Sequence, residues 1–442
     1  MTNAPDNSPS GIGPLELDSA ATDFPARFAA LLAMKREVSE EVDQAVARIV
    51  QAVVAGGDQA VIDFSRQFDR LDLTPETLRV SEGELDAAAG ACDGETLAAL
   101  KTARDRIEAY HSRQLPKDER FTDALGVTLG WRWTAVAAVG IYVPGGTASY
   151  PSSVLMNAVP AKVAGVARIV MAVPTPDGAV NPLVFAAARL AGVDEVYRIG
   201  GAQAVAALAY GTDTIRPVDK IVGPGNAYVA AAKRRVFGRV GIDMIAGPSE
   251  VLVLADGSAN PEWIAADLLA QAEHDTAAQS ILVTDDRALA TAVKAAVAGQ
   301  LKTLPRREIA GASWRNFGAI IHVASLAEAI PLVDRLAPEH LEIVAADADA
   351  LARRIRNAGA IFLGGHTPEA IGDYVGGSNH VLPTARSARF SSGLGVLDFM
   401  KRTSILHCTP DSLAALGPAA IALGRAEGLD AHARSVSIRL NR

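Results

Sequence analysis

The most constraining feature of the sequence is a regular alternation of short apolar runs with Ala-rich helical stretches. Four buried-strand candidates occur between about 134 and 250, namely AVAAVGIYV, RIVMAVP, EVYRIGG and DKIVGPG. Five more follow after residue 250, namely EVLVLAD, SILVTDD, AIIHVAS, LEIVAAD and AIFLGG. Short apolar runs that alternate with helices predict parallel sheets with helices on both faces. We therefore expect an α/β protein with two units of similar texture, as an ancestral duplication would leave.

A chain of 442 residues is too long for one ordinary core and should divide into at least two domains. Residues 1–22 are rich in Pro, Asn, Ser and Gly, and we expect a loose arm followed by a helix. The stretch PTARSARFSSGLG (383–395) predicts a linker to a small C-terminal segment. The predicted parts are an N-terminal arm and helix (1–38), two Rossmann-like parallel-sheet domains (39–141 with 251–382, and 142–250), and the C-terminal segment (383–442).

Composition and charge narrow the class of protein. The chain is 49% hydrophobic and 21% charged, with a net charge of −8, which indicates a globular protein without a basic face for nucleic acid or anionic membrane. We expect neither a signal peptide nor a transmembrane helix, because the N-terminus lacks the required basic and apolar regions and no apolar run approaches the necessary length. The only cysteines, Cys92 and Cys408, argue against a disulfide framework and favour a reducing cytoplasm.

Glycine-rich turns follow three of the predicted strands, at IYVPGG (141–146), IGGAQAV (199–205) and VGPGNAY (222–228). Ligands of parallel open sheets bind at the carboxyl ends of strands, where such turns bring backbone N–H groups toward a phosphate. None is a complete dinucleotide fingerprint, because Tyr228 occupies the third glycine position and no acidic residue marks the next strand end. From spacing alone, a nucleotide site and ordinary strand-to-helix corners both remain open.

Polar residues interrupt the Ala- and Leu-rich stretch DLLAQAEHDTAAQ (267–279). In a helix, Gln271 and His274 are neighbours at i and i+3, whereas Glu273 points roughly 100° away from His274. This pattern fits either a solvated polar face or a pair of ligands aimed at a cation.

Further acidic and imidazole side chains lie near the later strands. Glu339 stands beside His340 directly before a strand, and an adjacent acid and imidazole can divide proton-transfer work. The other candidates are Asp373 and His380 in GDYVGGSNHVLP, and Glu427 and His432 in EGLDAH. Imidazoles, a carboxylate and an amide oxygen suit zinc, but the scattered spacing leaves surface and packing roles equally open.

Eight of these stretches together resemble the L-histidinol dehydrogenase family, in its order and at its separations. They are GIYVPGG, GGAQAVAALAYGT, IVGPGNAYVAAAK, DMIAGPSEVLVLAD, DLLAQAEHD, APEHLE, GDYVGGSNHVLPT and EGLDAH. The resemblance covers the chain from about residue 25 to its end. The run from AGPSEVLV to AQAEHD is its most specific part.

The resemblance implies a metal and substrate site. The family's ligands for one zinc ion per subunit match Gln271, His274, Asp373 and His432. Its contacts with L-histidinol match the same four residues together with Ser249, His340 and Glu427, and His380 is expected close by. Gln is an unusual zinc ligand, so its assignment rests on the resemblance more than on coordination chemistry.

The resemblance also implies the cofactor and the reaction. Tyr142, Gln203 and Asn226 match positions that hold NAD, and each lies in one of the three glycine-rich turns. The implied reaction oxidises L-histidinol through L-histidinaldehyde to L-histidine, the end of histidine biosynthesis, with two NAD in succession. His340 would take the alcohol proton, and Glu339 would activate the water that hydrates the aldehyde.

A homodimer is the implied assembly. The C-terminal segment is too small for a core of its own and would carry Glu427 and His432 into the partner subunit's active site. The part made of 39–141 with 251–382 would hold the metal and the catalytic residues, and 142–250 would bind NAD.

Two alternatives remain at this stage. One is a related zinc and NAD dehydrogenase that acts on another small alcohol, such as a sulfonated diol, which Ser249 and Glu427 argue against. The other is a zinc hydrolase, which would have no need of the glycine-rich turns. Structural or surface roles are expected for Cys92, Cys408, His111, His322, His366 and His407.

Overall fold

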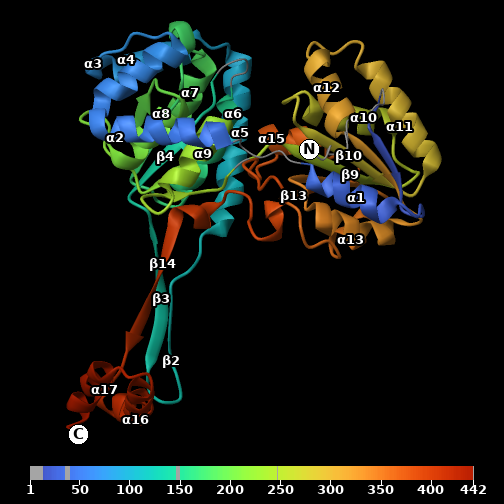
Figure 1. Cartoon of the computed structure of the whole chain (residues 1–442). Coiled ribbons are helices and arrows are strands. Elements are labelled where there is room, and N and C mark those ends of the chain that lie inside the picture. The colour runs from blue at the N-terminus through green and yellow to red at the C-terminus, as the bar shows by residue number, and fades with distance from the viewer. Residues whose placement is uncertain (1–12, 35–39, 146–149, 246, 442) are drawn as a thin grey trace, which may run out of the picture.

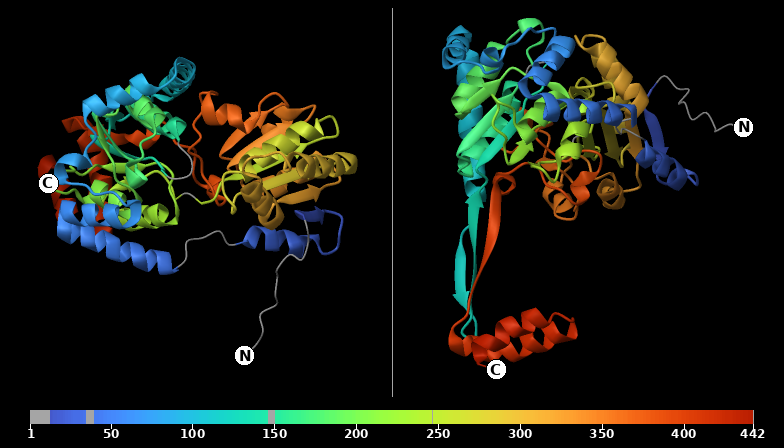
Figure 2. Two further views of the ribbon diagram at one scale, coloured as in Figure 1. Left: turned by 90° about the horizontal axis from the view of Figure 1, so that it is seen from above. Right: turned by 60° about the vertical axis from the view of Figure 1, so that its left-hand side comes forward.

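Two α/β domains and a long projection make up the protein (Figure 1). In this computed structural model the described residues are 13–34, 40–145, 150–245 and 247–441. The predicted arm and helix therefore lie partly outside the described residues, at 1–12 and 35–38. The C-terminus lies at the tip of the projection, far from both domains (Figures 1 and 2).

The first domain is built on a six-stranded parallel sheet, ordered β1-β11-β10-β9-β12-β13. Its strands are β1 (Leu15–Asp18), β9 (Glu250–Ala255), β10 (Gln279–Thr284), β11 (Ala319–His322), β12 (His340–Val344) and β13 (Ala360–Leu363). One face is covered by α10 (Pro261–Ala272), α11 (Arg287–Gln300) and α12 (Arg307–Phe317). The other face is covered by α1 (Phe24–Ala33), α13 (Leu326–Leu336) and α14 (Ala348–Ala352), while α15 (Glu369–Tyr374) follows β13.

The second domain is built on a five-stranded parallel sheet, ordered β6-β5-β4-β7-β8. Its strands are β4 (Ala138–Tyr142), β5 (Arg168–Ala172), β6 (Glu195–Tyr197), β7 (Lys220–Val222) and β8 (Gly241–Ile242). Numbered within its own unit, each sheet has the order 3-2-1-4-5, and β1 is added beside strand 3 of the six-stranded sheet. The predicted pair of Rossmann-like domains is confirmed, and the shared order is what a duplication would leave.

Helices cover both faces of the five-stranded sheet. One face carries α2 (Glu40–Asp69), α8 (Gly201–Tyr210) and α9 (Ala227–Val236). The other carries α4 (Glu82–Ala91), α5 (Gly94–His111), α6 (Pro151–Val163) and α7 (Pro182–Ala191). Short helical turns are α3 (Pro75–Leu78), η1 (Ser112–Gln114) and η2 (Pro176–Gly178).

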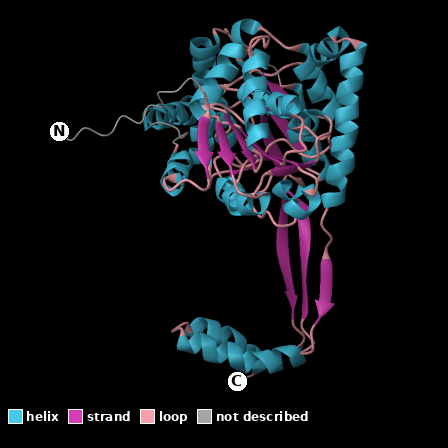
Figure 3. Ribbon diagram, turned by 90° about the vertical axis from the view of Figure 1, so that its right-hand side faces the viewer, coloured by secondary structure: helices cyan, strands magenta, loops and turns pink. Residues whose placement is uncertain are grey.

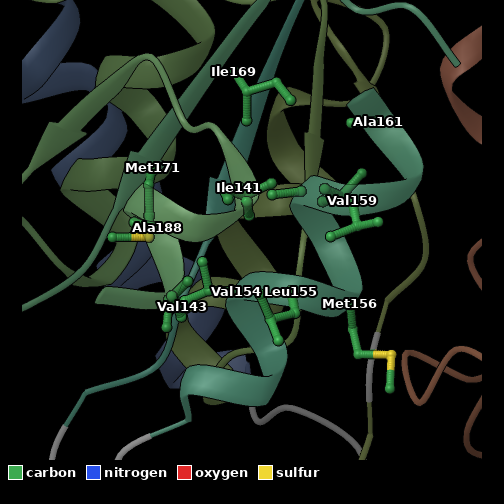
Figure 4. Close-up of a cluster of buried hydrophobic side chains, with 14 of the residues drawn as sticks. Ile141, Val143, Val154, Leu155, Met156, Val159, Ala161, Ile169, Met171 and Ala188 are labelled. Carbon is green, nitrogen blue, oxygen red and sulfur yellow. The ribbon is translucent and has the colours of Figure 1, made fainter. Parts of the chain in front are cut away.

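Local sequence explains these elements. Every residue of β4 is buried, as expected for a parallel strand with helices on both sides. Ile141 packs with Val154, Val159 and Met171 in the core between β4, β5 and α6 (Figure 4). Polar caps begin the helices: the side chain of Asn226, for example, accepts from the N–H groups at the start of α9.

The predicted domain division differs from the structure for residues 39–141. We placed this segment with 251–382, but α2 packs on α8 and α9, and α5 packs on α6 and α7. Val46, Ile49 and Val53 belong to the same core as β5 and α8. The apolar stripe of an amphipathic helix shows that it must be buried, but not against which sheet.

The predicted loose arm also differs from the structure where it is described. Residues 15–18 form β1, which pairs in parallel with β11 from Leu15↔Ala319 to Asp18↔His322. Lys294 and Arg287 form ion pairs with Glu16 and Asp18 of this strand. The four-residue strand carries too few apolar side chains to stand out in a polar stretch.

The projection is a three-stranded antiparallel stalk that ends in a helical hairpin (Figure 3). Its strands are β2 (Glu119–Thr122), β3 (Thr128–Ala135) and β14 (Met400–His407), ordered β14-β3-β2. Beyond them lie α16 (Pro410–Ala426), α17 (Asp430–Ser437) and η5 (Ile438–Leu440). The predicted linker holds the short turn η3 (Ser387–Arg389), and η4 (Val396–Phe399) leads into β14.

One described helix, α2, is long and apolar enough to cross a membrane by length and composition alone, contrary to the expectation that no stretch would be. Its backbone leaves helical geometry at Gly57, where φ is 54°. Its buried side chains pack into the core of the five-stranded domain, so these contacts account for its apolar face.

Candidate active site

A cavity of about 480 Å³ lies between the two α/β domains. The five-stranded domain contributes a wall made of the turn after β7 and of neighbouring residues. The six-stranded domain contributes most of the candidate residues named from the sequence. Those that line the cavity are Asn226, Ser249, His274, Glu339, His340, Asp373 and His380.

The two sheets present opposite edges to this cavity. Gly223, Pro224 and Gly225 follow β7 and therefore lie at the carboxyl edge of the five-stranded sheet. Ser249 directly precedes β9, and His340 is the first residue of β12, so both lie at the amino edge of the six-stranded sheet. The cavity therefore borders the carboxyl edge of the five-stranded sheet, where a ligand was expected, but the amino edge of the six-stranded sheet.

The predicted metal ligands Gln271 and His274 lie at the end of α10. Gln271 is fully buried, and neither its amide oxygen nor its amide nitrogen has a hydrogen-bond partner among the described residues. The helix ends at Ala272, and His274 stands in the turn that follows, where its N–H donates to the Gln271 carbonyl oxygen over 3.2 Å. An unpaired buried amide is costly, so this site fits a bound cation.

Asp373 is the third predicted metal ligand that lies beside the cavity. One ligand atom each from His274, Asp373 and Glu369 lie within 4.8 Å of one another. His274 is exposed at the cavity, but desolvation by the surrounding protein lowers the pKa of its imidazole, which favours the neutral form that binds metals. Burial opposes ionisation of Asp373, but the neighbouring His340 outweighs it and holds the pKa of Asp373 below its ordinary value.

Glu427 and His432 do not join this cluster within one chain. Both are exposed and lie at the tip of the stalk, on the turn after α16 and on α17 (Figures 1 and 3). The four predicted zinc ligands are therefore split, with three beside the cavity and one at the far end of the molecule.

Glu339 and His340 are buried side by side at the start of β12. Glu339 Oε2 accepts the backbone N–H of Glu250 over 2.9 Å, and His340 Nδ1 lies 3.0 Å from the Glu250 carbonyl oxygen. A carbonyl can only accept, so Nδ1 carries the proton and Nε2 of the neutral ring is left with its lone pair. Among the described residues His340 Nε2 has no hydrogen-bond partner, and it lies 3.7 Å from Asp373 Oδ1.

Burial and neighbouring charge shift the pKa values of this pair. Burial raises the pKa of the Glu339 carboxyl to about 7. Burial alone would lower the pKa of His340, but the carboxylates of Glu369 and Glu339 outweigh it and hold that pKa well above its ordinary value. Strongly shifted groups that share one cavity are typical of a catalytic centre.

Glu369 is a buried residue of the site that sequence reasoning missed. It is the first residue of α15, and its Oε2 lies 3.9 Å from His340 Nδ1. Its own N–H donates to Glu342 Oε1 over 2.7 Å, and burial raises the pKa of Glu369 to about 8 and that of Glu342 to about 9. The one usable signal was spacing, because Glu369 precedes Asp373 by four residues on the same helix.

His380 connects the two domains at the cavity. Its Nδ1 lies 3.0 Å from the carbonyl oxygen of Asp373, and its Nε2 lies 3.2 Å from Ser153 Oγ on α6. Burial lowers the pKa of this imidazole. The side chain therefore links α6 to α15.

The three residues predicted to bind NAD have different surroundings. Tyr142 is buried at the end of β4, and its hydroxyl oxygen accepts the N–H of Gly201 over 3.0 Å. Gln203 is buried beside the same turn, and its amide oxygen has no partner. Asn226 lines the cavity and caps α9. Of the three, only Asn226 is part of the cavity wall.

The turn after β7 is held by an ion pair that the sequence did not predict. Lys233 and Asp243 are almost fully buried and in contact. Lys233 Nζ donates to the carbonyl oxygen of Gly223 over 2.9 Å, and Asp243 Oδ2 accepts the N–H of Gly223 over 2.7 Å. Gly223 has φ +106°, and an added Cβ would lie 2.2 Å from the Tyr142 carbonyl oxygen, so only glycine fits.

The side chains expected to be structural lie outside the wall of this cavity. They are Cys92, Cys408, His111, His322, His366 and His407. His111 is buried and contacts the carbonyl oxygen of Ile107, and His366 packs on Trp263. Both cysteines are free thiols.

Comparison with known proteins agrees with this geometry. The family model described as histidinol dehydrogenase matches residues 32–440. Histidinol dehydrogenase of Rhodopseudomonas palustris is 71% identical over 428 residues, covering 97% of this chain and 99% of that protein. The enzyme of Brucella suis is 71% identical over 419 residues, covering 95% and 97%. The crystal structure of histidinol dehydrogenase from Elizabethkingia anophelis superposes with a TM-score of 0.92 at 35% identity, covering 97% of this chain and 98% of that one.

The match spans both domains and the stalk, and so includes every stretch on which the resemblance was based. This chain belongs to the histidinol dehydrogenase family.

Proposed function

We propose that the protein oxidises L-histidinol to L-histidine through L-histidinaldehyde, with two NAD used in succession and zinc in the active site. Membership of the family supports the oxidation of histidinol in histidine biosynthesis. The observation that carries the chemistry is the unpaired His340 Nε2 beside the buried Glu339 carboxyl, in a cavity walled by both domains. Each oxidation removes a hydride from carbon and a proton from oxygen.

The residues that would hold zinc are Gln271, His274 and Asp373, together with His432 of the partner subunit. The unpaired amide of Gln271 and the clustered ligand atoms of His274 and Asp373 support this set. Zinc would supply a positive charge that orients the substrate and favours neutral imidazoles nearby.

His340 would act first, as the base for the alcohol. Its Nδ1–H points to the Glu250 carbonyl oxygen, which leaves Nε2 to accept the proton of the substrate hydroxyl. The contact with Glu250 also fixes the ring plane, because Nδ1 is held from the neighbouring strand β9. NAD would take up the hydride in each oxidation.

Glu339 would act second, on the water that hydrates the aldehyde. Its pKa of about 7 places the carboxyl where it can both accept and release a proton near neutral pH. The N–H of Glu250 holds one carboxylate oxygen, so the group has a fixed orientation. Two bases at adjacent positions of β12 suit two proton transfers at one carbon.

NAD would lie against the glycine-rich turns of the five-stranded domain. Gly223 allows close approach of the backbone, the N-terminus of α9 follows at Asn226, and the free amide oxygen of Gln203 lies near the turn after β6. A zinc hydrolase, the alternative function, would have no need of these glycine-rich turns. We infer a cytoplasmic location and no nucleic-acid partner from the two free thiols and the acidic charge.

The deciding measurement is the yield of NADH from L-histidinol. We expect two NADH for each histidinol consumed, loss of activity on chelation, and recovery when zinc is returned. A sulfonated diol serves as the control substrate. NADH formed from the diol but not from histidinol would overturn the proposal.

The metal assignment has a test that does not depend on turnover. Changing His274 to Asn removes one ligand, and metal analysis of the purified variant should show lost zinc. A variant that retains a full complement of zinc would contradict the assignment.

We also propose a homodimer in which each active site uses both chains. Glu427 and His432 lie exposed at the tip of the stalk, beside exposed apolar side chains such as Leu423 and Ile438. Such a tip has too little buried surface to be stable alone and needs a surface to pack on.

Mixing two inactive variants tests the shared site. His340→Ala and His432→Ala subunits are combined after reversible dissociation. If the sites are shared, each mixed dimer has one intact site, and random reassociation restores roughly a quarter of wild-type activity. Background activity, with mixed dimers confirmed by mass, would rule the shared site out.

A further inference from the structure

Glu369 is a buried carboxyl group beside the cavity to which the proposed reaction gives no role. Its side chain is 2% exposed, and Oε2 has no hydrogen-bond partner among the described residues. Leaving a carboxyl oxygen buried and unpaired is costly, so its retention calls for a function. The nearest group with a complementary charge, once protonated, is the His340 ring.

Three oxygens surround His340 Nδ1. The Glu250 carbonyl oxygen lies at 3.0 Å, Glu339 Oε2 at 3.8 Å and Glu369 Oε2 at 3.9 Å. The two carboxylates are not equivalent, because Glu339 Oε2 already accepts the N–H of Glu250. Glu369 Oε2 is the one that accepts no hydrogen bond from another described residue.

The position of Glu369 is itself fixed by the fold. The N–H of Glu369 donates to Glu342 Oε1, and Glu342 is a buried residue of β12, two positions after His340. One strand therefore carries the base and also anchors the helix that brings Glu369 to it. Asp373 lies on the same short helix, on the Nε2 side of the ring at 3.7 Å.

We propose that Glu369 is a positioning residue for His340, holding the Nδ1 side of the ring and stabilising the imidazolium that forms when Nε2 takes the alcohol proton. In this arrangement Glu339 is left free for water. The inference rests on the role proposed above for His340. A negative charge near a buried cation is effective because the surroundings screen it weakly.

Glu369 also lies within 4.8 Å of ligand atoms of His274 and Asp373, so a metal ligand is the competing role. The two roles differ in what they predict. A ligand would be needed for zinc retention and for both oxidations. A positioning residue would be needed for the step that charges His340, and only while His340 is present.

The test is a double-mutant cycle with Glu369→Gln and His340→Asn, followed separately with L-histidinol and with supplied L-histidinaldehyde. We expect Glu369→Gln to lower kcat for the alcohol by roughly 10- to 100-fold, with little change in KM and a normal zinc content. In the His340→Asn background the same change should cost nothing further. Glu369→Asp, which keeps the charge, should recover part of the activity.

Each other outcome overturns the inference. Equal losses in the two backgrounds would show that Glu369 does not act through His340. Loss of zinc would make it a metal ligand, and a larger loss with the aldehyde than with the alcohol would assign it to the water step instead. If the single variant His340→Asn oxidises the alcohol at the wild-type rate, the proposed role of His340 as the base is wrong. That result concerns the proposed function and does not depend on Glu369.

Discussion

At the amino edges of the two sheets, the pKa values of buried carboxyl groups are shifted in opposite directions. In the five-stranded sheet, Glu195 at the start of β6 pairs with Arg168 at the start of β5 over 2.8 Å and with Arg216 over 2.9 Å. Burial opposes ionisation of Glu195, but these arginines outweigh it and lower its pKa to about 2. In the six-stranded sheet, Glu339 lies directly before β12 without a cationic partner of fixed charge, and burial raises its pKa to about 7.

At the carboxyl edges it is the five-stranded sheet that borders the cavity, through the turn after β7. In the six-stranded sheet, Asp256 follows β9 and links the turns after β9 and β12, because it accepts the N–H groups of Ser258 over 2.9 Å and of Ala346 over 2.8 Å. The same strand order thus yields one sheet that offers its carboxyl edge to a ligand and one that offers its amino edge.

The largest effect on reaction rate is expected for Glu339→Gln. Removal of a general base typically costs on the order of 10²–10⁴ in rate, and we expect this loss in the oxidation of supplied histidinaldehyde. The folded-state pKa lies above the ordinary value of 4.5, so ionisation of Glu339 destabilises the fold. The variant should therefore gain stability relative to wild type as the pH rises from about 4.5 to about 7, as measured by denaturant unfolding of the metal-free protein.

A variant that lost both activity and stability at pH 8 would break the comparison, because Glu339 would then be a structural partner like Glu195.

The Glu195→Gln variant should be less stable than wild type but should retain its catalytic activity. The folded-state pKa of about 2 lies below the ordinary value of 4.5, so the ion pairs stabilise the fold above about pH 4.5 and this contribution disappears as the pH falls toward 2. The shift corresponds to about 3 kcal/mol at neutral pH. Urea unfolding at pH 7 and at pH 3 measures it, with kcat and KM near wild type while the variant is folded. Equal stability losses at both pH values would show that charge is not the cause.

The smallest effect is expected for Asp256→Asn. The amide keeps one acceptor oxygen but loses charge-assisted bonds to two N–H groups, which costs about 1 kcal/mol. Activity and zinc content should not change, because Asp256 does not line the cavity. A raised KM for NAD in this variant would show that the turn after β9 takes part in cofactor binding.

Much of the fold followed from local patterns. Runs such as AVAAVGIYV and EVLVLAD are apolar on both faces, and only strands covered on both sides need that, so both sheets were predictable. The partner of α2 was not, because an apolar stripe contains no information about which surface buries it. Strand β1 was missed for a related reason, since an edge strand of four residues has only Leu17 as a buried side chain.

The resemblance predicted a set of site residues but not their geometry. It named Glu339, His340 and His274, and the structure brings these three to one cavity. It could not place Glu339 and His340 at an amino edge, because strand ends look alike in sequence. Glu369 carried no motif, and the feature that distinguishes it is a buried Oε2 without a hydrogen-bond partner among the described residues, which only packing determines.

The order of the strands along the chain sets the order in which the molecule can assemble during synthesis. β1 pairs with β11, as at Leu15↔Ala319, and all strands of the five-stranded sheet are made between them. The five-stranded domain is therefore an insertion that can fold while the ribosome is still translating the rest of its host. β1 and the β2–β3 hairpin must wait with open edges, the hairpin until β14 emerges to form Ala135↔Met400. The newly made chain thus holds the wall proposed to bind NAD before it holds the proposed catalytic residues Glu339 and His340.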